Sequence, residues 1–357
     1  MGSSLNLSAE ITPIVAHDLA AGHVPGAVVV VSRQGKIAFR QAFGLRMTEP
    51  APAQLRTDDI FDLASLTKVI ATTTAIMQLV EQGRIQLDAP AATYWPAFAA
   101  NSKEAITIRQ LLTHTSGLAP DLDLSTSWRG RDDGLARAAA ARTVRAPGTA
   151  FLYSDINFIV LGEIVARVSG EPLDIYVQDH VFEPLGMTTT GFHPPASSLD
   201  RIVATDREQG HLRWGEVQDP TAYRMGGVAG HAGLFSTADD LARFATMLLR
   251  GGELDGARIL QPATVTLMTQ AQALPGGTRR GLGWDMASPY AQGLDQWFGP
   301  MSFGHTGYTG CLMWIDPATQ TYLIVLTSRL HPDGGGDVKP LRQDLGRLVG
   351  TLIRSRS

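Results

Sequence analysis

The chain has 357 residues, of which 44% are hydrophobic and 18% are charged, and its 30 lysines and arginines nearly balance its 34 aspartates and glutamates. A globular chain of this length buries most of the surface that its unfolded form exposes, so it needs neither disulfides nor a metal to fold. This composition excludes a disordered chain, a collagen and a coiled coil, and the scattered charges exclude the basic face of a nucleic-acid-binding protein.

The N-terminal part predicts a helix followed by a β-hairpin. Ser8 is a suitable cap for a helix whose apolar residues recur at helical spacing as far as Leu19, and Gly22 ends this helix. Residues 27–32 form a β-branched run, and a glycine turn leads into a second strand over residues 36–43. Because the run of valines is continuous, we expect this hairpin to lie in a sheet that is covered on both faces.

The rest of the chain predicts helices in its middle and strands again near its end. Glycine-rich residues 226–233 separate these two parts. The remaining predicted elements are, in chain order, helices over residues 65–82, 107–112, 156–168 and 241–248, strands over residues 311–315 and 321–327, and a last helix over residues 341–352. Residues 120–145 and 273–300 have no readable pattern.

This order of elements predicts an α+β fold, in which an antiparallel β-sheet is flanked by helices and carries an inserted all-helical lobe. The hairpins near both ends argue against a doubly wound α/β fold. We expect residues 1–66 and 226–357 to form one discontinuous sheet lobe and residues 67–225 to form the helical lobe. The functional site is expected at the junction of the two lobes.

Cysteine usage and the N-terminus bear on the compartment. The single cysteine, Cys311, cannot form an internal disulfide, which fits a reducing compartment. Residues 1–19 lack the basic and apolar regions of a secretion signal, and no apolar run of about 18 residues occurs. We therefore expect a soluble, cytoplasmic protein without a membrane partner, or an exported protein if residues 1–4 replace a signal peptide.

Ser65 and Lys68 stand three residues apart at the start of the predicted helix over residues 65–82. Residues at this spacing share one helix face, so the lysine lies within hydrogen-bond reach of the serine hydroxyl. A serine hydroxyl needs such a neighbour to become a nucleophile, and a helix N-terminus adds backbone N–H groups where an oxyanion would form. Taken alone, however, this pattern more often marks a helix cap followed by a solvated lysine.

Several motifs of other enzyme classes are absent from the sequence. It contains no phosphate-binding loop, no dinucleotide-binding glycine pattern, no His-Glu-x-x-His and no Gly-x-Ser-x-Gly elbow. Its nine histidines make no pair at the spacing of helical metal ligands. We therefore expect no cofactor and no metal.

Two later motifs change the interpretation of the first. Tyr153-Ser154-Asp155 precedes a predicted helix, and His305-Thr306-Gly307 precedes a predicted strand. In order and context the three motifs resemble those of the serine β-lactamase and penicillin-binding protein superfamily. The pattern is most similar to the branch that contains class C β-lactamases, D-Ala-D-Ala carboxypeptidases and family VIII carboxylesterases, and the resemblance covers nearly the whole chain.

The resemblance implies catalysis through an acyl-enzyme. Ser65 attacks a carbonyl carbon, and Lys68 and Tyr153 handle its proton. Both side chains have ordinary pKa values of about 10, so one of them must be depressed to act as a base, and the choice is left open. The backbone N–H groups of Ser65 and Tyr308 would form the oxyanion hole.

Two of the implied binding residues depart from the β-lactamase pattern. The residues implied in oxyanion or substrate binding are Tyr308, Asp155, His305, Thr306 and Gly307. Asp155 replaces the usual asparagine; as an ionised acceptor it should pair with Lys68, which favours Tyr153 as the base. His305 replaces the usual lysine, so a positive charge for a substrate carboxylate would depend on pH.

Both departures lower the expectation of efficient β-lactam hydrolysis and suit a neutral ester, or a peptide that is recognised in another way. We therefore expect a serine hydrolase, first a carboxylesterase for small or short-chain esters. The alternatives are a D-amino-acid peptidase or D-Ala-D-Ala carboxypeptidase, a weak β-lactamase, and a penicillin-binding sensor without turnover. The partner would be a small ester, amide or β-lactam, and the oligomeric state is left open.

Overall fold

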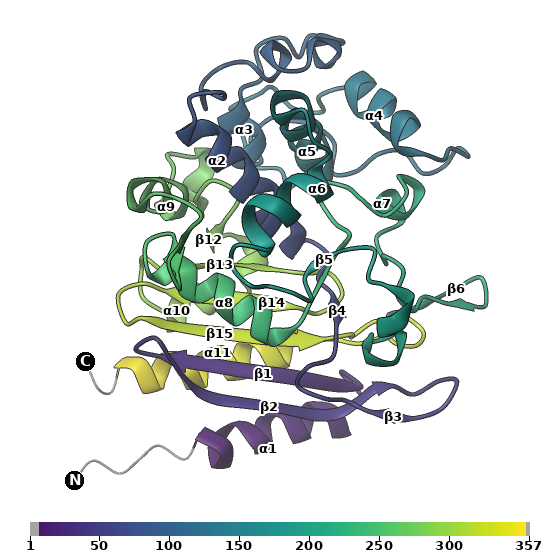
Figure 1. Cartoon of the computed structure of the whole chain (residues 1–357), viewed down its shortest axis with the longest axis vertical. Coiled ribbons are helices and arrows are strands. Elements are labelled where there is room, and N and C mark those ends of the chain that lie inside the picture. The colour runs from purple at the N-terminus through teal and green to yellow at the C-terminus, as the bar shows by residue number, and fades with distance from the viewer. Residues whose placement is uncertain (1–6, 355–357) are drawn as a thin grey trace.

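The computed structural model describes residues 7–354, and an eight-stranded antiparallel sheet forms their centre. The strand order is β11-β12-β13-β14-β15-β1-β2-β3, so the first and last parts of the chain meet where β15 pairs with β1 (Figure 1). The strands are β1 (Gly26–Arg33), β2 (Lys36–Met47), β3 (Ala53–Gln54), β11 (Arg279–Arg280), β12 (Asp285–Ala287), β13 (Phe303–Thr306), β14 (Leu312–Asp316) and β15 (Thr321–Thr327).

The valine run of β1 is buried on both faces of the sheet. Val28 and Val30 belong to the larger hydrophobic core, whereas Val29 and Val31 belong to the core on the opposite face. Side chains of a strand alternate between faces, so a strand with helices on both sides must be apolar throughout. The predicted coverage on both faces is confirmed.

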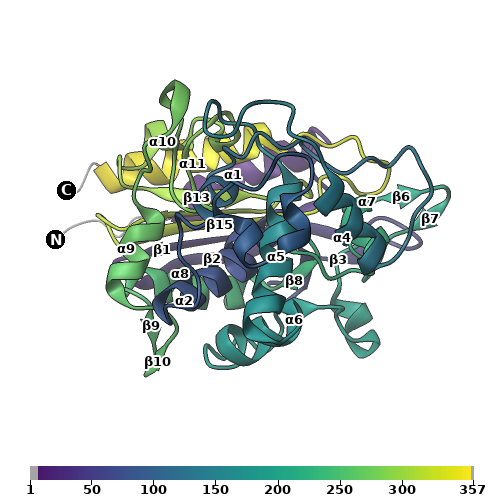
Figure 2. The same cartoon turned by 90° about the horizontal axis from the view of Figure 1, so that it is seen from above.

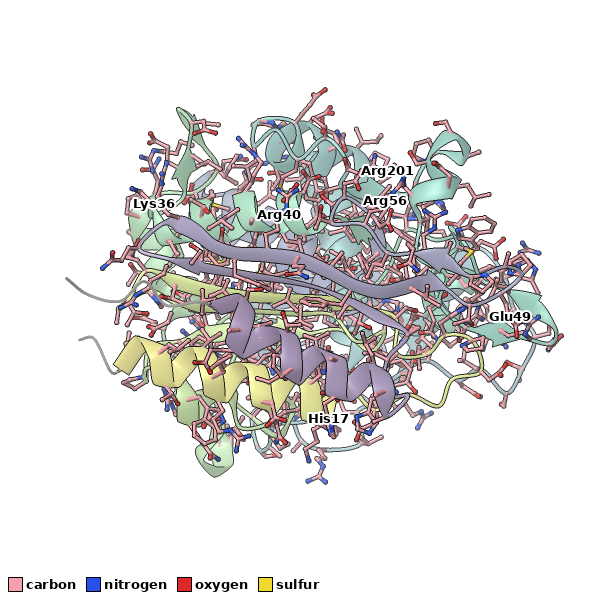
Figure 3. The ribbon with its side chains drawn as sticks, turned by 90° about the horizontal axis from the view of Figure 1, so that it is seen from below. His17, Lys36, Arg40, Glu49, Arg56 and Arg201 are labelled. Atoms are coloured by element: carbon pink, nitrogen blue, oxygen red, sulfur yellow. The ribbon has the colours of Figure 1, made fainter. Side chains whose placement is uncertain are left out.

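Two terminal helices cover the outer face of the sheet. The helices α1 (Leu7–Ala20) and α11 (Lys339–Arg354) lie side by side across it, as Figure 3 shows. Ile11 of α1 and Leu341 and Leu345 of α11 are completely buried against the strands. Neither these two nor any other helix within residues 7–354 has the length and apolar character needed to cross a membrane.

The other face of the sheet carries α8 (Ala238–Leu249) and, above it, the mostly helical middle of the chain (Figures 1 and 2). The Thr237 side chain caps α8 by accepting a hydrogen bond from the backbone N–H of Asp240. The other α-helices are α2 (Thr74–Glu81), α3 (Ile108–Leu112), α4 (Arg131–Ala140), α5 (Asp155–Ser169), α6 (Leu173–Val177), α7 (Pro220–Arg224), α9 (Pro262–Thr269) and α10 (Leu294–Trp297).

Short strands outside the main sheet complete the fold. They are β4 (Phe61–Asp62), β5 (Gly191–Phe192) and β8 (Leu234–Ser236) in one small sheet, β6 (Arg207–Glu208) with β7 (His211–Leu212), and β9 (Glu253–Leu254) with β10 (Ala257–Arg258). The predicted α+β architecture, a large antiparallel sheet flanked by helices, is confirmed. The regular secondary structure within residues 67–225 is mainly helical but includes β5, β6 and β7. The lobe boundaries stay a prediction.

The predicted helix over residues 65–82 is not a single α-helix. Ser65 lies in a turn, Lys68–Thr73 form a π-helix (η1), and α2 follows. The side chains of Lys68 and Thr72 donate hydrogen bonds to the backbone carbonyls of His231 and Gly230, at 3.0 and 2.7 Å. Both contacts are tertiary and accompany the π-helix, whose turns are wider than those of an α-helix. The spacing of apolar residues along the sequence does not distinguish the two kinds of helix.

Candidate active site

Ser65 lies in a strained turn between β4 and η1. The preceding residue, Ala64, has a φ of 46°, in the left-handed region that residues with a Cβ rarely adopt. The buried carboxylate of Asp62 holds this turn, since its oxygens accept the backbone N–H groups of Ala64 at 2.8 Å and Gln218 at 2.7 Å. Burial raises the pKa of Asp62 to about 6, although both hydrogen bonds oppose the rise. Strain of this kind is frequent at functional sites.

Lys68 is completely buried beneath Ser65. Its Nζ donates to Ser65 Oγ at 2.9 Å and to the carbonyl of His231 at 3.0 Å, and it forms an ion pair with Asp155 Oδ1 at 2.6 Å. Burial by itself would lower the pKa of Lys68, but Asp155 and the Tyr153 hydroxyl raise it above its usual value. Lys68 therefore remains an ammonium ion at neutral pH and is a donor to Ser65.

Tyr153 lies beside Ser65 and Lys68, and the ring of His114 stacks on it. Lys68 Nζ lies 5.1 Å from the centre of the Tyr153 ring, and the His114 ring stacks on the tyrosine with the ring centres 4.3 Å apart. Burial raises the pKa of the Tyr153 phenol, while Lys68 and a hydrogen bond with Ser65 oppose the rise. His114 accepts the backbone N–H of Ser154 on Nδ1 at 3.1 Å. This contact fixes the loop that carries Tyr153.

The third predicted motif spans the end of β13 and the turn into β14. Gly307 lies so close to the Leu63 carbonyl oxygen that a Cβ at this position would be 2.4 Å from it. Glycine therefore lets the β13–β14 turn pack directly against the Ser65 turn.

The two backbone N–H groups expected to form the oxyanion hole have no partner in the structure. Within residues 7–354, the backbone N–H groups of Ser65 and Tyr308 donate no hydrogen bond. Both donors are free to bind an oxygen of a substrate.

His305 is buried and uncharged. Its Nδ1 donates to the carbonyl of Thr306 at 2.8 Å. Burial, followed by the positive charges of Arg280 and Lys68, holds the pKa of His305 well below its ordinary value of 6.5. The sequence suggested a charge at this position that depends on pH; the surroundings instead keep the imidazole neutral throughout the physiological range.

A neutral His305 predicts that acidic and neutral substrates share one pH dependence. A histidine charge is lost as pH rises through its pKa, so a histidine with a much lowered pKa has no charge to lose above about pH 6.5. The ratio of kcat/KM for an acidic ester to that for a neutral ester with the same leaving group should stay constant from about pH 6.5 to 8. A ratio that falls as pH rises would restore the charged role.

A cavity of about 640 Å³ brings the predicted residues together. Lys68 lies behind the cavity wall, where its Nζ contacts two lining residues, Ser65 and Asp155. The predicted residues that line the cavity are Ser65, Tyr153, Asp155, His305, Thr306, Gly307 and Tyr308. The structure thus gathers the whole predicted set around one hollow, between the helical region and the C-terminal end of β13.

Asp219 and His231 form an ion pair beside Lys68. Asp219 Oδ1 lies 2.9 Å from His231 Nε2. Burial would raise the pKa of Asp219, but the positive charge of His231 holds it at about 2. One ligand-type atom from each of Asp219, His231 and Asp155 lies within 4.8 Å of the others. Because Lys68 pairs with Asp155 and the other two pair with each other, all three side chains already have partners.

Comparison with known proteins agrees with this geometry. A sequence model of the family described as Beta-lactamase matches residues 11–347. The chain belongs to the beta-lactamase family. Members of this family and the relatives below are serine hydrolases, and so is this chain. The resemblance noted from the three motifs is therefore confirmed.

Two relatives and one solved structure are similar to this beta-lactamase-family chain over most of its length. An "N-acetylmuramyl-L-alanine amidase" of Bacillus subtilis (strain 168) is 31% identical and aligns over 90% of this chain and 81% of the relative. A "Putative D-alanyl-D-alanine carboxypeptidase" of Escherichia coli (strain K12) is 30% identical over 86% and 79%. The structure of EstCE1, "a hydrolase with promiscuous acyltransferase activity", superposes with a TM-score of 0.77 at 25% identity, covering 97% and 99%.

Several residues of the site carried no signal in the sequence. The residues that the sequence did not assign to the cavity include Gln218, Asp219, Tyr290, Gln292, Arg329, Lys339 and Arg342. They come from the loop before α7, from residues 273–300, from the segment just after β15, and from the first turns of α11. None stands in a motif, so only the tertiary structure reveals that they lie beside Ser65.

Proposed function

We propose that this serine hydrolase is a carboxylesterase that cleaves small esters through an acyl-enzyme on Ser65. The observation that carries the proposal is the arrangement of Ser65 Oγ, 2.9 Å from a lysine that Asp155 holds as a cation at 2.6 Å. Since that lysine already carries its proton, Tyr153 is the group left to act as the base.

The mechanism follows from these positions. Tyr153, as a phenolate that Lys68 stabilises, takes the proton of Ser65 while Oγ attacks the ester carbonyl carbon. The oxyanion that forms accepts hydrogen bonds from the backbone N–H groups of Ser65 and Tyr308. The C–O bond to the leaving alcohol then breaks, and the Tyr153 hydroxyl returns the proton to that alcohol. Water attacks the acyl-enzyme through the same steps and releases the acid.

The neutral third motif and two exposed aromatic rings support an ester as the first substrate class. His305 is neutral and buried, so the third motif offers no fixed cation for a substrate carboxylate. Tyr290 and Tyr308 are 46% and 61% exposed and line the same cavity. Exposed aromatic rings suit an apolar acyl or alcohol group. The solved structure of EstCE1 is that of a hydrolase with acyltransferase activity, which also fits ester chemistry.

A D-amino-acid peptidase or amidase is the second candidate. Lys339 is exposed at the cavity, and Arg329 lines it as well. These cations suit a peptide carboxylate in place of the charge that His305 lacks. The names of the two curated relatives, an amidase and a carboxypeptidase, point in the same direction. Weak β-lactamase activity ranks third, because Asp155 cannot donate a hydrogen bond to a β-lactam side chain.

One assay separates these candidates. A short-chain p-nitrophenyl ester, nitrocefin and a peptide ending in D-Ala-D-Ala are followed in parallel through the burst and the steady state. The proposal expects repeated turnover of the ester at a kcat/KM well above those of the other two substrates. Faster turnover of the peptide would replace the proposal with the second candidate. Acylation without a second turnover on every substrate would contradict all three enzymatic candidates.

A further inference from the structure

Arg342 of α11 is buried beside the cavity without an acidic partner. Only 3% of its surface is exposed, and within residues 7–354 it makes no ion pair with a carboxylate. Its NH2 group donates to the carbonyls of Gly307 at 2.9 Å and Cys311 at 2.8 Å. Burial lowers the pKa of Arg342 to about 10, so the guanidinium still carries its charge at neutral pH. The direct hydrogen-bond partners of this buried charge are neutral groups, and Asp337 raises the pKa of Arg342 without forming an ion pair with it. Burial of a charge without a direct ionic partner is costly, which suggests a role for it.

The carbonyl that Arg342 binds belongs to the same peptide group as the Tyr308 N–H. In a trans peptide the C=O and N–H groups point in opposite directions. The bond between Gly307 and Tyr308 is trans, since the cis bonds are those preceding Pro50 and Pro332. By holding the carbonyl from the α11 side, Arg342 turns the N–H toward the opposite side. A charged donor on the carbonyl also polarises the peptide group, which makes its N–H a stronger donor.

A second arginine fixes the next peptide group. Arg329 Nε donates to the Tyr308 carbonyl at 2.8 Å, and its guanidinium lies 4.4 Å from the centre of the Tyr308 ring. Its NH1 group donates to Gly336 at 2.9 Å, which ties the turn to the segment that leads into α11. Arginines therefore hold the peptide groups on both sides of Tyr308, although the Tyr308 side chain itself is mostly exposed.

We propose that Arg342 is a positioning residue for the oxyanion hole: it orients and polarises the Gly307–Tyr308 peptide group, and Arg329 secures the following one. This inference rests on the proposed acyl-enzyme chemistry at Ser65. Arg342 acts through the backbone N–H and makes no contact with the reacting atoms. Two other roles are distinguishable outcomes of the test. Arg342 can serve only to join α11 to the β13–β14 turn, or it can bind an anionic group of the substrate directly.

The test compares Arg342→Met, Arg342→Lys and Arg329→Met with the wild-type chain. Two quantities are measured: kcat and KM for a neutral p-nitrophenyl ester, with kcat counted per active site by burst titration, and the affinity for an alkyl boronic acid. The boronic acid forms a tetrahedral adduct with Ser65 whose oxygen mimics the oxyanion. Removing an oxyanion donor outright costs about 100- to 1,000-fold in kcat, so weakening one should cost about 10- to 100-fold.

For Arg342→Met we therefore expect kcat to fall about 10- to 100-fold, KM to change less than about threefold, and boronate affinity to fall in parallel with kcat. Arg342→Lys should recover part of the loss, because it keeps the charge, and Arg329→Met should lower kcat about 10-fold. If Arg342→Met does not fold, the other two variants decide the question on the same criteria.

Lys103 offers a matched control away from the site. It is a fully buried cation that donates to the carbonyls of Ala139 and Ala141 at 2.8 and 2.6 Å and to that of Ala100. Lys103→Met should lower the melting temperature without changing kcat per active site. Unchanged kcat and boronate affinity in the arginine variants would leave only a structural role and overturn the inference. A rise in KM alone would assign Arg342 to substrate binding and overturn it as well.

Failure of the inference differs from failure of the proposed function. If the wild-type chain shows no ester turnover that depends on Ser65, the proposed function fails before any arginine variant is measured. If that turnover is present and the arginine variants match the wild-type chain, only the role of Arg342 is lost.

Discussion

Replacement of Ser65 by alanine is expected to reduce steady-state turnover of a p-nitrophenyl ester by about 10,000-fold or more. The serine hydroxyl is the nucleophile in the proposed mechanism, and no neighbouring group can replace it: Lys68 is a cation and Asp155 is engaged in its ion pair. Alanine differs from serine only in lacking the hydroxyl, so it should fit the turn between Ala64 and Leu66. The melting temperature should therefore change little.

Ser169→Ala is a suitable control for this experiment. The Ser169 hydroxyl donates to the carbonyl of Val165 at 2.7 Å, at the end of α5. It lies outside the cavity, so this variant should keep wild-type kcat and KM. Ester turnover that survives Ser65→Ala while the variant remains folded would remove Ser65 from the nucleophile's role.

The second large effect is expected for Tyr153→Phe, which should lower kcat about 1,000-fold or more because it removes the proposed base and leaves the lysine charged. Phenylalanine keeps the ring that stacks on His114, so the local packing should persist. The phenolate form of Tyr153 grows as pH rises, and burial raises the pKa of this phenol, so the growth continues above neutral pH. Wild-type kcat/KM should therefore climb through neutral pH toward an alkaline plateau, and Tyr153→Phe should lack this limb.

A pH profile alone does not separate Tyr153 from Lys68, because the pKa of Lys68 is also raised. Incorporation of 3-fluorotyrosine at position 153 separates them, since fluorine lowers the pKa of the phenol and leaves the amine unchanged. The rising limb should move to lower pH. The same substitution at Tyr94, whose hydroxyl accepts the backbone N–H of Gln86 at 2.7 Å away from the cavity, should not move it. A limb that stays in place for the fluorinated Tyr153 would assign the base to Lys68.

The sequence predicts the framework of the fold because its strongest signals are local. The valine run of β1 reflects burial on both faces of the sheet, and the apolar spacing in α8 and α11 reflects burial of one helix face against the sheet. The segments that gave no pattern have physical reasons. Helix α4 contains Gly134, where a Cβ would be 2.6 Å from the Met225 side chain, and glycine weakens a helix signal. The strands β11 and β12 have two and three residues, too few to display alternation.

The sequence predicts the members of the site better than their charges. Ser65, Lys68, Tyr153 and Asp155 stand in motifs, and the expected pairing of Asp155 with Lys68 is present at 2.6 Å. The charge of His305 could not be predicted, because it depends on burial and on Arg280, which lies 25 positions earlier in a segment without a pattern. The proposed role of Arg342 could not be predicted either, because it depends on hydrogen bonds to the backbone carbonyls of Gly307 and Cys311, which no side-chain motif records.

Intact-mass spectrometry of the chain during turnover tests the central claim most directly. The chain is mixed with a p-nitrophenyl ester in excess, quenched in acid during the burst and weighed, and the modified peptide is then sequenced. The proposed mechanism predicts a mass increase of one acyl group per chain, located on Ser65, that disappears once the ester is consumed. The same treatment of Ser65→Ala should give no adduct. Hydrolysis without an adduct, or an acyl group on any other residue, would contradict an acyl-enzyme on Ser65.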